Sequence, residues 1–307
     1  MKKIGILGMG GIGSFIGAKL SKSYKNSNEV EVIFICRNET KEIINRKGLT
    51  LITPQETITS TADLTSDNPE DIGILDVLIV ATKSYSLASA ISSYKNCIHP
   101  KTVIIPLQNG VDAKSIIENA IETNSNNILE GCIYVASNVE EPGVVKHVGG
   151  PGKMFFGNND KLDFKWVEKL LLEGGLDIVY TKEIQKILWK KYLFVSPLSV
   201  MTAALNITFG ELAEDSKHMY TLKQMMIEVQ TLAEKFNVTL TEKDIEDSLA
   251  MVSKFPYQAK TSFQLDFENN NQNTEKENLL DYVITNGEEH NVSVEKYREM
   301  NKKIANR

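Results

Sequence analysis

The first 181 residues alternate short, mostly apolar runs with segments of helical periodicity. The apolar runs are "KIGIL" (3–7), "EVEVIFIC" (29–36), "DVLIVAT" (76–82) and "TVIIPLQ" (102–108). The last two show no alternation of apolar and polar positions, which is typical of strands that helices cover on both faces. Strands that alternate with helices at this spacing predict an α/β domain built on a doubly wound parallel sheet.

The pattern changes at about residue 182, where strand-like runs disappear. Helical periodicity continues through "EIQKILWKKYLFV", "TLKQMMIEVQTLAEKF", "EKDIEDSLAMV" and "NLLDYVITNGEEH". A chain of 307 residues is also long for one hydrophobic core. The sequence therefore predicts two domains, an α/β domain over residues 1–181 and an all-α domain over residues 182–307.

Two segments depart from these patterns. Residues 132–157 contain short β-rich runs around Pro142-Gly143 and Pro151-Gly152, which predict an antiparallel addition to the sheet. Residues 268–273, "ENNNQN", are of low complexity, and we expect a solvated loop or the end of a helix there.

Composition and charge exclude some classes of function. With 42% hydrophobic and 24% charged residues the chain has the composition of a globular protein. A net charge of −6 argues against a nucleic-acid or anionic-membrane partner. We do not expect the start, "MKKIGILGMGGIG", to be a signal peptide, because its apolar part is short and broken by glycines. The most apolar later run, Tyr192–Leu205, is too short to span a bilayer.

Cysteine and histidine usage adds two expectations. Cys36, Cys97 and Cys132 lie far apart without a CxxC motif, which favours reduced thiols and a cytoplasmic location. The four histidines show no metal-ligand spacing, so no metal site is predicted. We expect a monomer or homodimer that acts on a small molecule.

The first chemical motif is Gly8-Met9-Gly10-Gly11-Ile12-Gly13, between a predicted strand and a predicted helix. This is the context that the Rossmann dinucleotide fingerprint requires. Gly8 permits a tight turn, Gly10 lets the backbone approach the pyrophosphate, and Gly13 lets helix and strand pack closely. The start of the helix then offers N–H groups to the phosphates. The alternative is a glycine-rich turn without a ligand.

The end of the second predicted strand bears on the choice of dinucleotide. NAD-specific folds place an acid there to hold the ribose hydroxyls. Here the strand ends "FICRNE", with Arg37 at that position and the acid delayed to Glu39. A guanidinium binds a 2′-phosphate through two hydrogen bonds, which favours NADP(H). The alternative is an ordinary surface arginine.

Polar residues also follow the third and fourth predicted strands. Lys83 comes directly after "LIVAT", and Gln108-Asn109-Gly110 comes after "VIIPL". Ligands of open α/β sheets bind at the carboxyl ends of strands, so both positions are candidates. Taken singly, the Asn-Gly pair could make a turn and Lys83 could be a solvated cation.

Two adjacent lysines, Lys190 and Lys191, lie within an apolar helical segment, "LWKKYLFVSPLS". Adjacent helical residues point about 100° apart, so the two lysines cannot share one environment. We expect one of them to reach solvent and the other to lie on the buried side of the helix. Burial lowers the pKa of a lysine and suits it to proton transfer.

Five motifs together resemble one known family. "GMGGIG", "ATKSY", "LQNGV", "LWKKYLF" and "TSFQLDF…TE" occur in the order and approximate spacing of the ketopantoate reductases (2-dehydropantoate 2-reductases), over the whole chain. The resemblance implies a Rossmann domain followed by a helical domain, NADPH as cofactor, and reduction of a 2-oxo acid to a 2-hydroxy acid. In the family this reaction converts 2-dehydropantoate to pantoate in pantothenate biosynthesis.

The resemblance assigns cofactor roles to residues that match the family's motifs. It places the loop from Gly8 to Gly13 at the pyrophosphate and Arg37 at the 2′-phosphate. Ala136 is implied as a further cofactor contact. Lys83 and Asn109 match residues on the cofactor and substrate side.

For the substrate, the resemblance implies three residues of the second domain. Lys191, rather than Lys190, matches the catalytic lysine, which would give a proton or a fixed cation to the oxygen that gains charge during hydride transfer. Ser262 and Glu275 match substrate-binding residues, and this chain has one extra residue between them, within residues 268–273.

The sequence departs from the family where the substrate is held. Asparagines are typical four and eight residues after the lysine, and here Val195 and Ser199 stand in their places. A third asparagine is replaced by Ala259. Ser199 remains as a candidate substrate contact, with Thr202 on the same face if the helix continues past Pro197, which we expect to kink or interrupt it. Three readings stay open: a ketopantoate reductase, a paralogous reductase of another 2-oxo acid, and a non-catalytic NADP(H)-binding regulator.

Overall fold

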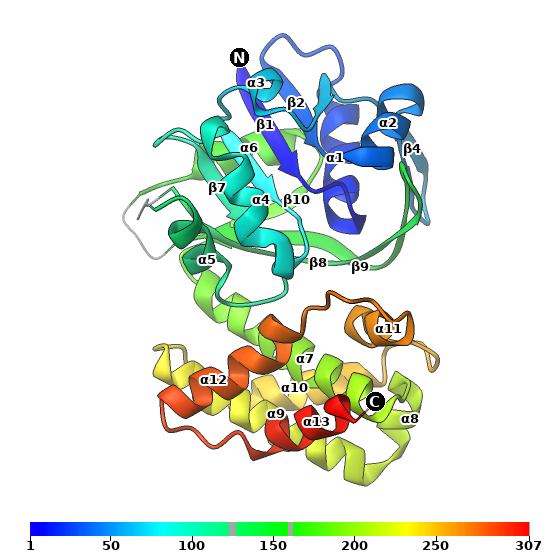
Figure 1. Cartoon of the computed structure of the whole chain (residues 1–307), viewed down its shortest axis with the longest axis vertical. Helices are drawn as coiled ribbons and strands as arrows, with labels where there is room; N and C mark the ends of the chain where they lie inside the picture. Colours follow the sequence, from blue (N-terminus) through cyan, green and yellow to red (C-terminus); the bar gives the residue numbers. More distant parts are fainter. Residues whose placement is uncertain (123–126, 159–161, 307) are drawn as a thin grey trace. The chain divides into compact units, whose positions relative to one another are not determined.

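The computed structural model describes residues 1–122, 127–158 and 162–306 (Figure 1). The chain divides into two compact units. The first holds residues 1–108 and 112–184, and the second holds residues 109–111 and 185–307. This division lies a few residues after the predicted boundary at 181. The tripeptide Asn109–Val111 belongs with the second unit, which the sequence pattern does not reveal.

A five-stranded parallel sheet forms the centre of the first unit, in the order β5-β2-β1-β6-β7. Its strands are β1 (Lys2–Leu7), β2 (Val30–Ile35), β5 (Leu64–Ser66), β6 (Val77–Val80) and β7 (Val103–Pro106). The four predicted strands are therefore confirmed, and β5 was not predicted. The Rossmann-type α/β fold is confirmed as well.

Both faces of the sheet's centre are buried, which explains why β6 and β7 are apolar throughout. In β2, Val32 and Phe34 enter one core cluster, whereas Ile33 and Ile35 enter another on the opposite face. The helices of the unit are α1 (Gly11–Ser23), α2 (Asn38–Lys47), α3 (Pro69–Ile72), α4 (Leu87–Ser93), α5 (Ala113–Ala120) and α6 (Lys165–Glu173), with short 3₁₀ turns η1 (Ser84–Ser86) and η2 (Lys95–Cys97).

A second sheet corrects the prediction of an antiparallel addition to the first sheet. It has the order β10-β9-β3-β4, and β8 pairs antiparallel with β9. Its strands are β3 (Leu49–Ile52), β4 (Thr57–Ser60), β8 (Glu130–Glu141), β9 (Val144–Gly157) and β10 (Asp177–Tyr180). The predicted turn at Pro142-Gly143 is confirmed. Pro151-Gly152 instead lies inside β9, where Gly152 has a φ of +73° and a side chain would collide with the ring of Phe15. The glycine thus serves close packing on α1 rather than a turn.

The second unit is all-helical in its described residues, as predicted. Its helices are α7 (Ile184–Leu205), α8 (Phe209–Glu214), α9 (Ser216–Lys235), α10 (Glu242–Val252), α11 (Ser262–Glu268), α12 (Tyr282–Glu289) and α13 (Glu295–Ala305), with a π-helical turn η3 (Glu277–Asp281) before α12. The predicted loop at residues 268–273 is confirmed, because α11 ends at Glu268 and residues 269–273 are exposed.

Helix α7 runs without a break through Pro197, so of the kink or interruption expected there, the interruption is wrong. Proline removes one backbone hydrogen bond, but Leu193, Val200 and Met201 on either side are fully buried and stabilise the helix by packing. The register from Lys191 to Ser199 is therefore helical. No helix in the described part of the chain combines the length and hydropathy that crossing a bilayer requires.

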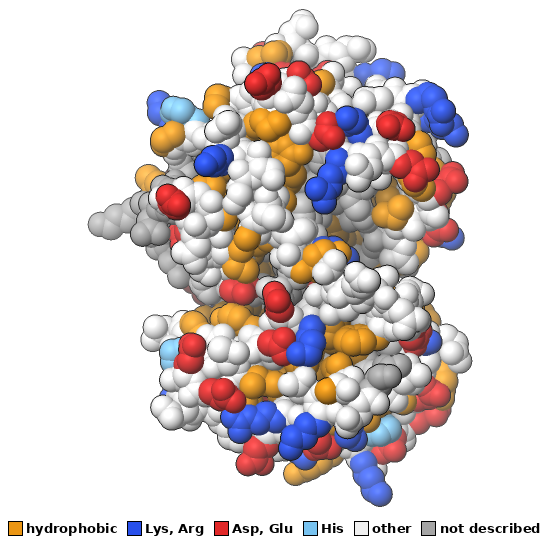
Figure 2. Space-filling view, viewed as in Figure 1, with side chains coloured by type: hydrophobic (Ala, Val, Ile, Leu, Met, Phe, Trp, Pro, Cys, Tyr) orange, Lys and Arg blue, Asp and Glu red, His pale blue; other side chains and the backbone are white. Residues whose placement is uncertain are grey.

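Charged side chains of both signs are interspersed on the visible face of the molecule (Figure 2). Many form close pairs of opposite charge, such as Lys22 with Glu56 and Arg298 with Glu288. This mixed surface agrees with the modest net charge of −6.

Candidate active site

The glycine-rich loop connects β1 to α1, and each of its glycines meets a different environment. Gly8 has a φ of +95°, which favours glycine. A side chain at Gly13 would collide with the carbonyl oxygen of Gly8, and one at Gly11 would collide with that of Ser137. A side chain at Gly10 would meet no atom within 4 Å. Gly10 thus faces open space beside the start of α1, the position that a pyrophosphate takes in such loops.

The two apolar residues of the loop face the protein interior. Met9 is 7% exposed and belongs to the core, and Ile12 packs against the same cluster. They can offer a cofactor only their backbone groups. Gly10, the N-cap of α1, has no side-chain cap, so the first N–H groups of the helix are not taken up by a capping side chain.

Gln108 links the ends of two strands near this loop. Its Nε2 donates to the carbonyl oxygens of Val80, at 3.2 Å, and Thr82, at 2.9 Å. Three buried side-chain oxygens here, on Gln108, Thr82 and Ser84, have no hydrogen-bond partner among the described residues. Unpaired buried polar atoms are costly, so together with the open space at Gly10 they fit a site built for a polar ligand such as a dinucleotide. Sequence reasoning named Gln108 only as part of a loop and missed this link.

The other predicted cofactor residues lie at strand ends or irregularities. Arg37 follows β2, is exposed, and is the N-cap residue of α2, where its side chain makes no capping hydrogen bond. Lys83 is exposed at the start of η1, directly after β6. Ala136 is exposed on β8 between two register shifts. Such bulges re-aim side chains, and the neighbouring Ser137 carbonyl lies against Gly11, so β8 brings Ala136 to the glycine loop.

The second unit joins two predicted site residues that are far apart in sequence. Lys191 Nζ donates to Asn109 Oδ1 at 3.0 Å, and both residues are partly buried. Val111, two residues after Asn109, packs against the helical core. This packing holds the Asn109–Val111 tripeptide beside α7, and the amide oxygen then orients the lysine ammonium.

Lys190 points elsewhere, as the helical geometry predicts, but it does not simply reach solvent. Its Nζ pairs with Asp244 Oδ1 at 2.6 Å, and the Asp244 side chain is only 9% exposed. Burial acts to raise the pKa of Asp244. The Lys190 hydrogen bond and those from the backbone and hydroxyl of Thr241 outweigh it and lower this pKa to about 2. Asp244 also forms a capping box with Thr241 at the start of α10.

Lys190→Ala is therefore expected to lower the free energy of unfolding by about 1–2 kcal/mol at neutral pH, because it leaves a buried carboxylate without its cation. A depressed carboxyl pKa stabilises the fold above the unfolded pKa, and this contribution is lost as the pH falls toward the folded pKa of about 2. The difference between wild type and variant should thus shrink as the pH falls from about 4 toward 2.

Urea unfolding across this pH range checks the expectation, with Lys186→Ala as control. Lys186 is exposed one turn earlier on α7 and makes no ion pair with any described residue. Equal stability of the two variants at neutral pH would show that the Lys190–Asp244 pair contributes nothing.

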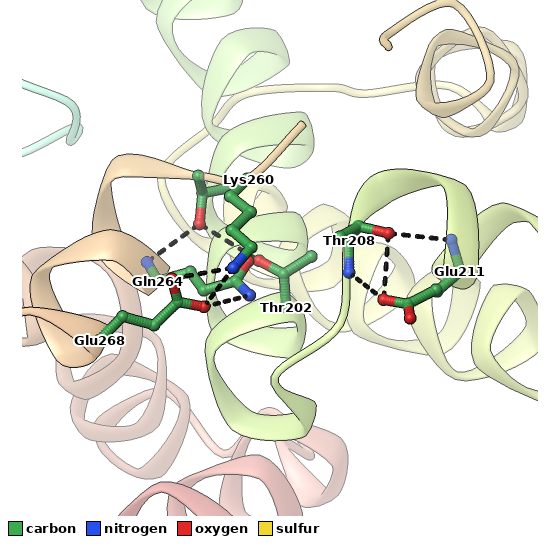
Figure 3. Close-up of polar contacts among 7 residues, drawn as sticks. Thr202, Thr208, Glu211, Lys260, Gln264 and Glu268 are labelled. Atoms are coloured by element: carbon green, nitrogen blue, oxygen red, sulfur yellow. Dashed lines mark hydrogen bonds and ion pairs between the residues drawn. The ribbon is translucent and has the colours of Figure 1, made fainter. Parts of the chain in front are cut away.

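The segment that carries Ser262 is bonded to the far end of α7 (Figure 3). Thr261 caps α11 by accepting a hydrogen bond from the Gln264 N–H, and its hydroxyl lies 3.2 Å from that of Thr202. Thr202 also donates to the Leu198 carbonyl at 2.9 Å and is fully buried, so its hydroxyl is already engaged. Ser199, 5% exposed, is the remaining hydroxyl on the Lys191 face of α7. Ser262 itself is exposed at the start of α11.

The same view shows the charges around α11 (Figure 3). Lys260 Nζ contacts both carboxylate oxygens of Glu268, at 2.8 and 2.9 Å, and Gln264 Nε2 donates to Glu268 at 3.2 Å. Thr208 and Glu211 form a separate capping box at the start of α8. The contacts of Glu268 with Lys260 and Gln264 hold the short helix that Ser262 begins.

The positions where the resemblance implies asparagines adjoin apolar side chains. Val195 and Ala259 are partly buried and pack against the helical core. Next to Val195, Phe194 stacks on Phe255 with ring centroids 5.9 Å apart. Glu275 is 4% exposed and lies two residues before the start of η3.

A parallel sheet with a glycine loop at a helix start, joined to a helical unit with a partly buried lysine, defines a dinucleotide-binding oxidoreductase. The family profile described as "Ketopantoate reductase PanE/ApbA" matches residues 4–161, and that described as "Ketopantoate reductase PanE/ApbA C terminal" matches residues 183–301. The chain belongs to the ketopantoate reductase family.

Individual relatives are more distant. The chain is similar to an uncharacterized oxidoreductase of Bacillus subtilis, YkpB, with 26% identity over 91% of this chain and 90% of the other. It is 24% identical to 2-dehydropantoate 2-reductase of Halobacterium salinarum over 95% and 94% of the two chains. A solved structure of D-mandelate dehydrogenase with NADH and anilino(oxo)acetate superposes with a TM-score of 0.85 at 20% identity, covering 99% of this chain and 97% of that one.

Proposed function

We propose that this protein uses NADPH to reduce a 2-oxo acid to a 2-hydroxy acid. The observation that carries the proposal is the hydrogen bond from Lys191 Nζ to Asn109 Oδ1, which holds a partly buried ammonium at a fixed place. When bound, the nicotinamide supplies a hydride to the carbonyl carbon of the substrate. Lys191 then donates a proton to the carbonyl oxygen as negative charge develops there.

The other site residues have supporting roles in this proposal. Asn109 orients the ammonium, and Gly8 to Gly13 with Ala136 hold the pyrophosphate and nicotinamide portions through backbone groups. Lys83 adds a cation at the end of β6. Ser199, Ser262 and Glu275 bind polar groups of the substrate.

Arg37 supports NADPH over NADH. It is exposed at the end of β2 and makes no ion pair with a described residue, so its guanidinium is available to a 2′-phosphate. Arg37→Asp is expected to weaken NADPH binding by about tenfold to hundredfold and to narrow the gap to NADH.

Fluorescence titration with both dinucleotides checks this, and Arg46→Asp is the matched control. Arg46 is exposed in the last turn of α2, the helix that begins after Arg37. Its replacement by aspartate changes the net charge by the same amount. Equal affinity of the wild type for NADPH and NADH would contradict the assignment.

The first substrate to consider is 2-dehydropantoate, because of the family and the 2-dehydropantoate 2-reductases among its relatives. The chain would then act in pantothenate biosynthesis. Val195 and Ala259 favour a second candidate, a 2-oxo acid with a larger apolar tail, since neither can replace a lost hydrogen bond. Each such loss costs about 1.5–3 kcal/mol with a charged group, or roughly tenfold to hundredfold in kcat/KM.

The experiment is NADPH oxidation with a panel of 2-oxo acids that includes 2-dehydropantoate, 2-oxoisovalerate and benzoylformate. Turnover of at least one of them supports the proposal. A kcat/KM for 2-dehydropantoate orders of magnitude above all others would contradict the apolar-tail candidate. Binding of NADPH with no turnover of any 2-oxo acid would contradict the reductase and favour the non-catalytic regulator.

Location and partners form part of the same proposal. We expect a cytoplasmic protein, monomeric or homodimeric, with a small-molecule substrate and no nucleic-acid or membrane partner. The three cysteines are buried. Burial, followed by the nearby Asp67 carboxylate, raises the pKa of Cys36 to about 12, so this thiol stays protonated at neutral pH.

A further inference from the structure

A wide helical turn follows the predicted substrate-binding glutamate. Residues Glu277–Asp281 form a π-helical turn, in which backbone hydrogen bonds join residues five apart. Such turns are rare and frequently lie at functional sites. The Glu275 carbonyl accepts a hydrogen bond from the Leu279 N–H at 3.0 Å, so the backbone of Glu275 is tied directly to this turn.

Two hydroxyl groups of α7 hold the inner side of the turn. Tyr192 OH donates to the Asn278 carbonyl at 2.5 Å, and Ser196 Oγ donates to the Leu279 carbonyl at 2.6 Å. Tyr192 and Ser196 lie one helical turn apart on the same face of α7 and are 2% and 0% exposed. Two successive carbonyls of the turn therefore have fixed donors on one rigid helix.

An ion pair holds the outer side of the turn. Lys276 Nζ lies 2.5 Å from Asp281 Oδ1, and these residues are five apart in sequence. In an α-helix, residues five apart point about 140° away from each other. The pair is therefore suited to the wide turn and favours it over an α-helical one.

Tyr192 directly follows Lys191, so its bond to the turn fixes the Glu275 segment against the same part of α7 that carries the lysine. We propose that Tyr192 and Ser196 are positioning residues that set the place of Glu275 relative to Lys191. This inference rests on the proposed function. It assigns two residues of the apolar helix, neither of which touches the substrate, to the binding of the 2-oxo acid.

The test compares two buried tyrosines of one hydrogen-bond network. Tyr297 OH lies 2.5 Å from Ser196 Oγ and is fully buried, but it makes no bond to the π-helical turn. Tyr192→Phe and Tyr297→Phe each remove one buried hydroxyl with little change of volume. Tyr192→Phe is expected to raise the KM for the best 2-oxo acid of the panel by about tenfold or more, with kcat changed only a few-fold. Tyr297→Phe should change neither constant by more than about twofold.

Two further measurements separate positioning from general destabilisation. Ser196→Ala should raise KM as Tyr192→Phe does. In a Glu275→Ala background, Tyr192→Phe should have no further effect on KM, because it acts through Glu275. Thermal melts and hydrogen exchange of residues 275–281 show whether the turn alone has loosened.

Equal KM values for Tyr192→Phe and Tyr297→Phe, or additive effects of Tyr192→Phe and Glu275→Ala, would overturn the inference. If the wild type reduces a 2-oxo acid but Tyr192→Phe and Tyr297→Phe have equal KM values, only the inference about Tyr192 and Ser196 is contradicted. A wild type that reduces no 2-oxo acid contradicts the proposed function first, and the inference with it.

Discussion

Replacing Lys191 with alanine is expected to lower kcat by about 10²–10⁴-fold, the usual contribution of a positioned general acid. The reason is geometric: Asn109 holds the ammonium at one place by a hydrogen bond of 3.0 Å, and alanine leaves nothing there to protonate the substrate oxygen. The pH profile of kcat should also lose its high-pH limb in this variant. NADPH affinity should survive, since the glycine loop and Arg37 belong to the first unit.

Lys190→Ala is the matched control for this prediction. It removes the same side chain one position earlier, but from a group that pairs with Asp244 rather than Asn109. Its kcat should stay within about twofold of wild type, while its free energy of unfolding falls by about 1–2 kcal/mol. Steady-state kinetics of both variants decide the matter. Matched losses of kcat, or a larger loss at Lys190, would show that the wrong lysine has been assigned.

The second large effect is expected at Gly10. Gly10→Val should abolish dinucleotide binding and leave the fold intact, because a side chain there meets no protein atom within 4 Å and would occupy the place of the pyrophosphate. The φ of Gly10 is −80°, which valine tolerates.

Gly13→Ala provides the contrast. Its methyl group would collide with the Gly8 carbonyl oxygen, so this variant should lower the melting temperature as well as binding. NADPH titration by fluorescence, together with thermal melts, distinguishes the two cases. An unchanged titration for Gly10→Val would mean that the loop does not bind the dinucleotide.

Four strands of the parallel sheet were predictable because burial on both faces gives long apolar runs, whereas β5, "LTS", is short and mostly polar and was not predicted. The second sheet was not predictable. Its edge strand β4, "TITS", alternates between buried and exposed positions over only four residues. Its long strand β9 contains Pro151, which reads as a turn in the sequence. Pairing with β8 and β10 keeps it extended, and such pairing depends on residues far away in the chain.

The site residues also fall into those that the sequence identifies and those that only the fold reveals. Gly8 to Gly13 and Arg37 follow local rules, so the sequence alone identifies them. The family register selects Lys191, and its partner Asn109 lies 82 residues away, so only the fold shows that they meet. Helical geometry alone predicts that Lys190 points away from Lys191, but it cannot predict that Lys190 pairs with Asp244.

Tyr192 and Ser196 give no signal in the sequence at all. They look like occasional polar residues in an apolar helix, because the groups that they bind are backbone carbonyls. Every residue type has a backbone carbonyl, so the sequence does not show which carbonyls accept these bonds. The π-helical turn that presents them has no simple sequence pattern either.

The central claim, transfer of hydride to a 2-oxo acid, is tested most directly by isotope transfer. NADPH carrying two deuterium atoms at C4 of the nicotinamide is incubated with the protein and the best 2-oxo acid of the panel, and the product is analysed by mass spectrometry. The account predicts a 2-hydroxy acid with one deuterium at C2, formed far more slowly by Lys191→Ala. An unlabelled product, or equal rates of labelled product from wild type and Lys191→Ala, would contradict it.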